Sequence, residues 1–134
     1  MFRQSALRPL ILSPFAATLA LLTALPAPLA AAAEEFQAVR DRDAFLSLVD
    51  GRELRMPLFR IRLAVRPDGS IEGSALGWGV SGSWDWKDGY FCREMDWSGK
   101  EIPYNCQLVE AKGNGELRFT VDRGQGDSAS FRLD

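Results

Sequence analysis

One stretch of the sequence decides the fold: Gly82-Ser83-Trp84-Asp85-Trp86-Lys87-Asp88-Gly89-Tyr90-Phe91-Cys92-Arg93-Glu94-Met95-Asp96-Trp97. Asp88-Gly89 at its centre is a two-residue hairpin signal. Such a turn sets the register, and the pairs we expect are Lys87 with Tyr90, Trp86 with Phe91, Asp85 with Cys92 and Trp84 with Arg93. One face of the hairpin then has the composition of a core: Trp84, Trp86, Phe91, Met95 and Trp97. The other face is mostly polar: Asp85, Lys87, Cys92, Glu94 and Asp96.

Arg93 is the exception on the aromatic face of this hairpin. A buried arginine needs a partner or an aromatic plane. Three interpretations are open from the sequence. Arg93 lies in a polar pocket, or a β-bulge returns it to solvent, or it forms a structural ion pair with one of three acids: Glu94, Asp96 or Glu101.

The pocket interpretation names further residues on the next strand. If Cys106 shares a face with Cys92, the opposite face carries Asn105, Gln107 and Val109. A concave aromatic site with a few convergent polar groups is typical of small-ligand pockets. The sequence therefore predicts a ligand site built from Trp84, Trp86, Arg93, Asn105 and Gln107.

Strand and turn signals continue on both sides of the hairpin. Apolar and polar residues alternate over 59–66, and further short strands are expected at 71–76, 80–87, 90–97, 102–110, 116–122 and 129–133. Residues 34–40 are an extended lead-in. One short helix is expected at 44–49, with N-cap acids in Asp41-Arg42-Asp43, an apolar face of Ala44, Phe45, Leu48 and Val49, and a stop at Gly51.

This spacing predicts a mostly β fold. We expect a small antiparallel meander barrel or curved sheet of seven to eight strands, with one short N-terminal helix over one end. The alternative is a two-sheet β-sandwich.

The first 33 residues predict a secretory signal peptide. Arg3 and Arg8 precede an apolar run at 10–29, and the small residues Ala31 and Ala33 suit cleavage before Glu34. An uncleaved anchor is the alternative, since about 20 apolar residues can span a bilayer. We expect a signal peptide at 1–33, one disulfide-containing β domain at 34–134, a periplasmic or secreted location, and membrane contact only before cleavage.

Two cysteines remain in the expected mature chain. An even number in an exported chain favours a disulfide between Cys92 and Cys106. A redox pair usually has the C-x-x-C spacing, which is absent. The chain has no histidine, and two cysteines alone cannot complete a four-ligand zinc site. We expect no metal and no cofactor.

The charge argues against a nucleic-acid partner. Removing residues 1–33 takes away two arginines and no acid, so 14 basic residues face 18 acidic ones and the net charge is −4. Nucleic-acid binders usually show a concentrated basic face.

Little in the sequence indicates catalysis. Without histidine, no Ser-His or Cys-His arrangement exists, and no glycine loop precedes a helix to bind phosphate. We therefore favour a non-enzymatic periplasmic small-ligand-binding or interaction module, whose partner is an unknown small molecule or an envelope protein. One alternative is a small hydrolase using carboxylates among Asp85, Asp88, Glu94, Asp96 and Glu101. The other is a protein-contact inhibitor or envelope-stress protein.

The segment 82–97, followed by Asn105-Cys106-Gln107, resembles a group of short exported bacterial proteins of unknown function. Some of these proteins are labelled dihydrodipicolinate reductase, which implies a cytoplasmic nicotinamide-dependent enzyme. The sequence has neither a dinucleotide-binding fingerprint nor a histidine, so it does not support that label. A weaker similarity is to lipocalin- and avidin-like barrels, since Gly82-Ser83-Trp84 matches the lipocalin G-x-W motif. It implies a barrel architecture only.

Overall fold

The computed structural model describes residues 10–11, 26 and 34–134. The predicted signal peptide at 1–33, and with it the choice between cleavage and anchoring, therefore lies almost wholly outside the described residues. Within the described part of the chain, no helix has the length and hydrophobicity that crossing a membrane requires.

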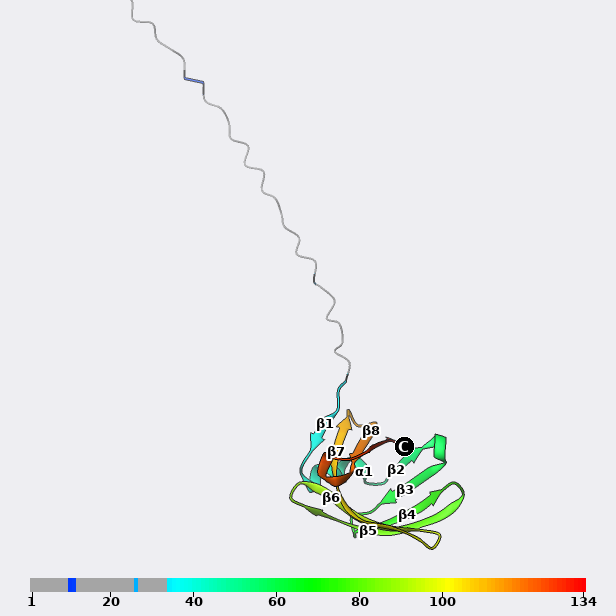
Figure 1. Ribbon diagram of the computed structural model, residues 1–134. Helices are drawn as coiled ribbons and strands as arrows, with labels where there is room; N and C mark the ends of the chain where they lie inside the picture. Colours follow the sequence, from blue (N-terminus) through cyan, green and yellow to red (C-terminus); the bar gives the residue numbers. More distant parts are fainter. Residues whose placement is uncertain (1–9, 12–25, 27–33) are drawn as a thin grey trace, which may run out of the picture. The chain divides into compact units, whose positions relative to one another are not determined.

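Residues 34–134 form a closed antiparallel β-barrel of eight strands, with one further strand paired to it (Figure 1). The described strands are β1 (Gln37–Val39), β2 (Glu53–Met56), β3 (Ile61–Val65), β4 (Ser70–Ala75), β5 (Trp78–Lys87), β6 (Tyr90–Trp97), β7 (Lys100–Lys112), β8 (Glu116–Thr120) and β9 (Ser128–Leu133). Strands β2 to β9 follow one another as a meander, and pairing of β9 with β2 closes the ring. The predicted meander barrel is confirmed, and the sandwich alternative is wrong.

The central hairpin has the predicted register. Strands β5 and β6 pair through all four expected positions, from Lys87 with Tyr90 to Trp84 with Arg93. Burial alternates along β6, where Phe91, Met95 and Trp97 are less exposed than Glu94 and Asp96. The two-residue turn and the aromatic alternation were together sufficient to place this part of the sheet.

Two elements differ from the prediction near the start of the barrel. The expected strand at 59–66 begins only at Ile61, because Pro57–Phe59 forms a 3-10 helix, η1, and Arg60 has a left-handed φ of 48°. Strand β2 was not expected. Leu54 is its one buried residue, so it has little apolar pattern, yet its pairing with β3 and β9 completes the barrel.

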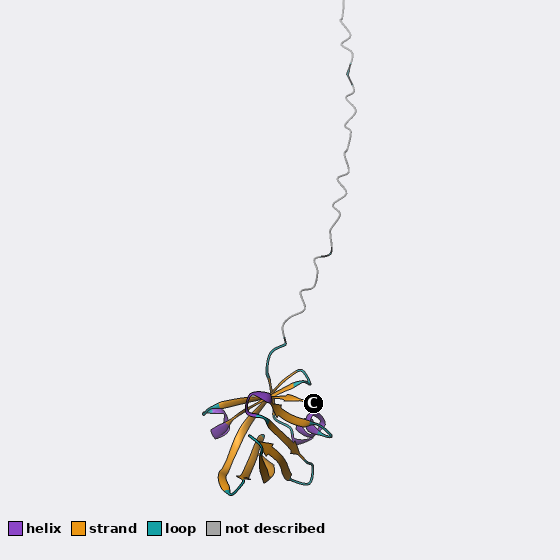
Figure 2. Cartoon of the chain, turned by 90° about the vertical axis from the view of Figure 1, so that its right-hand side faces the viewer, coloured by secondary structure: helices purple, strands orange, loops and turns teal. Residues whose placement is uncertain are grey.

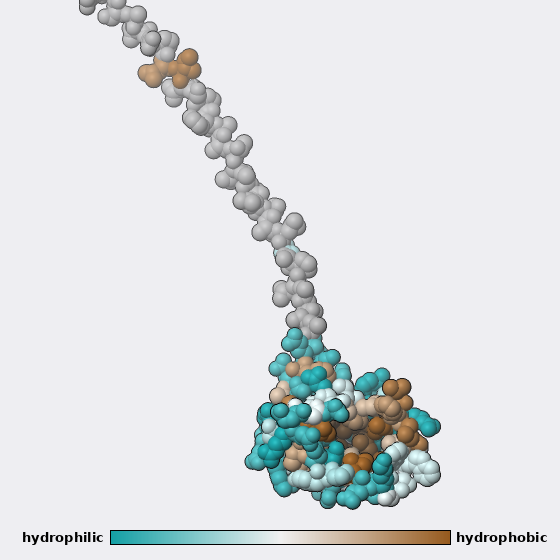
Figure 3. Space-filling model, viewed as in Figure 1, coloured by the Kyte–Doolittle hydropathy of each residue, from teal (hydrophilic) through white to brown (hydrophobic). Residues whose placement is uncertain are grey.

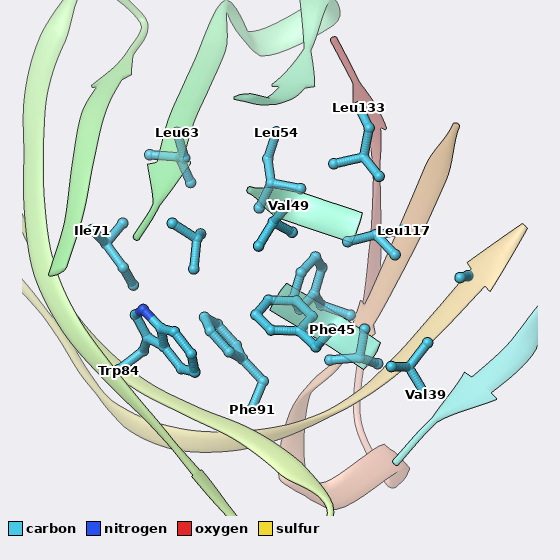
Figure 4. Packing of buried hydrophobic residues seen from close by; sticks show 14 of the residues in the cluster. Val39, Phe45, Val49, Leu54, Leu63, Ile71, Trp84, Phe91, Leu117 and Leu133 are labelled. Carbon is cyan, nitrogen blue, oxygen red and sulfur yellow. The ribbon is translucent and has the colours of Figure 1, made fainter. Parts of the chain in front are cut away.

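Helix α1 (Arg42–Val49) plugs one end of the barrel (Figure 4). The Asp41 side chain caps it by accepting a hydrogen bond from the backbone N–H of Ala44 at 2.9 Å. Phe45 and Val49 point inward and are buried, whereas Ala44, expected on the apolar face, is exposed. Leu48 packs against the core as predicted, and Leu46 packs there in place of Ala44, so the apolar face of the helix is shifted from the predicted one.

Polar contacts hold α1 and its flanks to the strand connections at that end. The Arg42 guanidinium donates to the carbonyl of Pro67 at 3.2 Å, and the indole N–H of Trp86 donates to the carbonyl of Arg40 at 3.1 Å. Arg52 donates to the carbonyl of Asn114 at 2.6 Å. Contacts with Pro67, Trp86 and Asn114, at three separate places around this end of the barrel, thus hold α1 and its flanking residues in position.

Gly82 in β5 lies where the backbone of β6 comes close. A Cβ atom at this position would overlap the carbonyl oxygen of Glu94 and lie 2.7 Å from the Met95 side chain, whereas one at Gly79 meets nothing within 4 Å. We expect Gly82→Ala to lower the free energy of unfolding by about 1–3 kcal/mol through overpacking. Urea denaturation, with Gly79→Ala as the matched control on the same strand, checks this; equal effects of the two variants would contradict it.

Candidate functional site

The barrel end opposite α1 is not covered by a helix of that kind. The connections there are η1, the turn at 76–77, the turn at 98–99 and the segment at 121–127, which contains the short element α2 (Val121–Gly124). Of these connections, η1 and the turns at 76–77 and 98–99 lie to the right in Figure 1, and Figure 2 turns that side toward the viewer. In Figure 3 apolar residues gather around a hollow in the visible face of the domain.

Two adjoining cavities occupy this half of the barrel. The first has a volume of about 280 Å³ and the second about 300 Å³. They share three lining residues: Leu63, Met95 and Phe131. The first cavity is further lined by Leu54, Val65, Ile71, Phe91, Arg93, Gln107, Phe119, Val121, Asp127, Ser128 and Ala129. The second is further lined by Phe59, Ile61, Ala75, Leu76, Val80, Trp97 and Ile102.

Arg93 lines the first cavity and is half-buried there. A bulge does occur beside it, but the extra residue is on β7: Arg93 pairs with Asn105 and Met95 with Ile102, so two residues of β7 face one of β6. The alternation of β6 is therefore unbroken, and Arg93 keeps the inward direction of Phe91 and Met95. The Arg93 side chain therefore does not turn to solvent, as the bulge interpretation expected.

The contacts of Arg93 leave most of its donors free for a ligand. One guanidinium N–H donates to the carbonyl of Pro103, in the bulge, at 2.8 Å. Within residues 34–134 it forms no ion pair, so the structural salt bridge with Glu94, Asp96 or Glu101 is not formed. Burial lowers the pKa of Arg93 below its usual value. Arginine nevertheless stays charged in proteins, so a positive charge faces the cavity.

Gln107 adds a second polar group to the same wall. It is only 7% exposed, and it lies diagonally across the β6–β7 ladder from Arg93, since its own partner is Phe91. Gln107 borders the cavity, and among the described residues no buried side-chain nitrogen or oxygen lacks a hydrogen-bond partner, so the amide, for which no side-chain hydrogen bond to the protein is found, is accessible from the cavity. Its donors and its acceptor can therefore form hydrogen bonds with a molecule inside the cavity.

The other three predicted site residues lie elsewhere. Trp84 and Trp86 pack around Phe45 in the closed half of the barrel, at ring-centroid distances of 5.6 and 5.1 Å. Their indole N–H groups donate to the carbonyls of Arg66 and Arg40. The sequence could not show that these two tryptophans are covered, because the helix that packs against them comes from a distant segment. The aromatic residues on the cavity walls are instead Phe59, Phe91, Trp97, Phe119 and Phe131.

Asn105 is engaged with the segment at the cavity mouth. Its amide donates to the Asp122 carboxylate at 2.7 Å, and its carbonyl oxygen accepts the backbone N–H of Asp122 at 2.9 Å. Asp122 and Arg123 both have left-handed backbones, with φ of 55° and 54°. Non-glycine residues adopt this conformation at a cost, so surrounding contacts must hold it.

We expect Asn105→Ala to lower the free energy of unfolding by about 1–2 kcal/mol, because it removes both hydrogen bonds that hold the left-handed turn. Chemical denaturation measures the loss, and hydrogen exchange at 121–126 should accelerate. Asn114→Ala, at an exposed turn, is the control. An unchanged exchange rate at 121–126 would contradict the assigned role.

The predicted disulfide is present between Cys92 and Cys106. The two cysteines face each other across the β6–β7 ladder, on the face opposite Arg93 and Gln107. Within residues 34–134 no free cysteine remains. The bridge therefore ties together the two strands that carry both polar groups of the cavity.

The carboxylates of the hydrolase hypothesis lie on the outer face. Asp85, Asp88, Glu94, Asp96 and Glu101 are all exposed. Glu94, Asp96 and Glu101 border a shallow depression of about 260 Å³ together with Ser81, Gly82, Ser83 and Met95. An open depression encloses a substrate poorly, so we favour the interior cavity as the site. In the described part of the chain, no group of acidic and cysteine side chains is arranged to hold a metal ion.

Fold and site together define a class of protein: a small, closed meander barrel, plugged by a helix at one end and holding an apolar cavity with one arginine at the other. Comparison of the chain with protein-family models, curated proteins and solved structures found no significant match.

Proposed function

We propose that the mature domain is a non-enzymatic binding module that holds a small apolar molecule inside its barrel. The observation that supports this most directly is the apolar interior of the open half, where two cavities share Leu63, Met95 and Phe131. Protein interiors are normally packed to the density of organic crystals. A domain of about 100 residues has few core residues to spare, so an unfilled interior of this size supports a binding role.

An exported location completes the proposal. Disulfides form and persist in oxidising compartments such as the periplasm or the extracellular space. The Cys92–Cys106 bridge therefore supports export of this domain, in agreement with the signal peptide that the sequence predicts.

The binding proposal predicts that filling the cavity abolishes binding. Ala129 lines the first cavity, and its neighbour Ser130 points outward from the same strand. We expect Ala129→Trp to weaken binding of the fluorescent apolar probe N-phenyl-1-naphthylamine at least tenfold, whereas Ser130→Trp leaves it within about twofold. Fluorescence titration measures this, and native mass spectrometry shows whether purified protein retains a ligand. A wild-type domain that binds no probe and carries no ligand would refute the proposal.

A second candidate function is contact with another protein through the open rim. Four large apolar residues are exposed there: Leu58 at 83%, Trp78 at 61%, Phe59 at 48% and Leu76 at 43%. Their connections touch, because the backbone N–H of Leu76 donates to the carbonyl of Phe59 at 3.1 Å. Exposed apolar patches of several hundred Å² often mark interaction sites, but Phe59 and Leu76 also line the second cavity. We therefore favour the rim as the entrance for the ligand.

A further inference from the structure

We propose that the ligand is an amphiphile with a single carboxylate head, bound by Arg93 and Gln107, and with an apolar tail that fills the second cavity. This inference rests on the binding function proposed above and specifies the chemical class of the ligand.

The two cavities differ in chemistry. The first carries the charged and amide side chains of Arg93 and Gln107 on neighbouring strands. Every residue that lines the second is apolar. A ligand that satisfies both needs a polar group at one end and none at the other, because a polar group buried without a hydrogen bond costs free energy.

The sign of the head group follows from the charges on the walls. The described structure gives Arg93 a carbonyl as partner but no carboxylate. Asp127 is the one acidic residue on the walls of the first cavity; it is exposed at the mouth and is not paired with Arg93. A half-buried guanidinium without a counter-ion favours an anion, and its planar fork matches a carboxylate with two parallel hydrogen bonds.

Gln107 narrows the choice further. Its amide has N–H donors and a carbonyl acceptor. An oxygen acceptor on the ligand that bonds to Arg93 also satisfies the Gln107 donor, whereas a cationic head would be repelled by Arg93. A doubly charged head would leave one charge without a described partner, since Arg93 is the one basic residue on either cavity wall. A monoanion fits best.

The test uses dodecanoate and dodecan-1-ol, which differ only in the head group, as competitors of N-phenyl-1-naphthylamine on the mature domain. We expect wild type to prefer the acid over the alcohol by at least tenfold. Arg93→Met keeps the apolar stem but removes the charge, and should reduce that preference at least tenfold. Arg93→Lys should keep part of it. Lys100→Met, at a basic residue outside both cavities, is the matched control and should keep all of it.

The possible outcomes test the carboxylate head group and the apolar binding function separately. Equal affinity for acid and alcohol in wild type would overturn the carboxylate head and leave the apolar binding function standing. An acid preference that survives Arg93→Met, or is lost in Lys100→Met, would overturn the assignment to Arg93. Failure of wild type to bind any of the three compounds would overturn both proposals. If Arg93→Met does not fold, as judged by circular dichroism, the Arg93→Gln variant with the same readout decides.

Discussion

Replacement of Phe45 by alanine should lower the free energy of unfolding by about 3–5 kcal/mol. Phe45 is fully buried at the centre of the plug formed by α1. Its ring packs on Trp86 at 5.1 Å, Phe91 at 5.2 Å and Trp84 at 5.6 Å, measured between ring centroids. Alanine loses the transfer free energy of the ring and leaves a hole that this rigid aromatic shell cannot collapse to fill.

Urea denaturation followed by tryptophan fluorescence measures this loss directly, because two of the neighbouring rings report on it. Leu58→Ala is the control, since Leu58 is 83% exposed and its truncation should change the free energy by less than about 0.5 kcal/mol. A cost below about 1 kcal/mol for Phe45→Ala would show that α1 does not act as the plug of the barrel.

Removal of the disulfide has the second large expected effect. The double variant Cys92→Ala/Cys106→Ala should lose about 3 kcal/mol, because the bridge closes a 15-residue loop and restricts the unfolded chain. The sulfur atoms lie on the face opposite Arg93 and Gln107, where Cys92 is fully buried, so the substitution also removes some packing on that side. The loss should appear mainly as a lower denaturation midpoint with an unchanged native fold.

Reductant provides the internal control for this prediction. Wild type in reductant should approach the stability of the double variant, and the variant itself should not respond to reductant. Thiol titration of the unfolded, unreduced protein should find no free thiol. Two free thiols, or a double variant as stable as oxidised wild type, would contradict the role assigned to the bridge.

Local sequence signals were enough for the central hairpin. Asp88-Gly89 fixes which residues face each other, and the alternation of aromatic with polar residues fixes which face is buried. The condition that Cys106 shares a face with Cys92, from which the opposite face of Gln107 follows, is met in the structure. These features depend on neighbours within about 25 residues, which is why a pattern in one segment predicts them.

The course of β2 and the turn at 121–124 could not be predicted in the same way. Strand β2 exists because β3 and β9 each offer it a free edge, and this depends on closure of the whole ring. The left-handed backbone of Asp122 depends on the side chain of Asn105, 17 residues earlier on another strand. Neither feature produces a recognisable pattern of apolar and polar residues in its own segment.

Arg93 shows most clearly what the sequence by itself determined and what the tertiary structure decided. The sequence determined that this arginine shares the aromatic face of its strand, and that a disulfide and a meander barrel were to be expected. Only the tertiary structure decided whether that face is filled. Helix α1 enters one half of the barrel and occupies the faces of Trp84 and Trp86, whereas the other half receives no such plug and stays hollow around Arg93. The physical reason is that filling depends on the volumes of side chains from many distant segments, which no single stretch of sequence specifies.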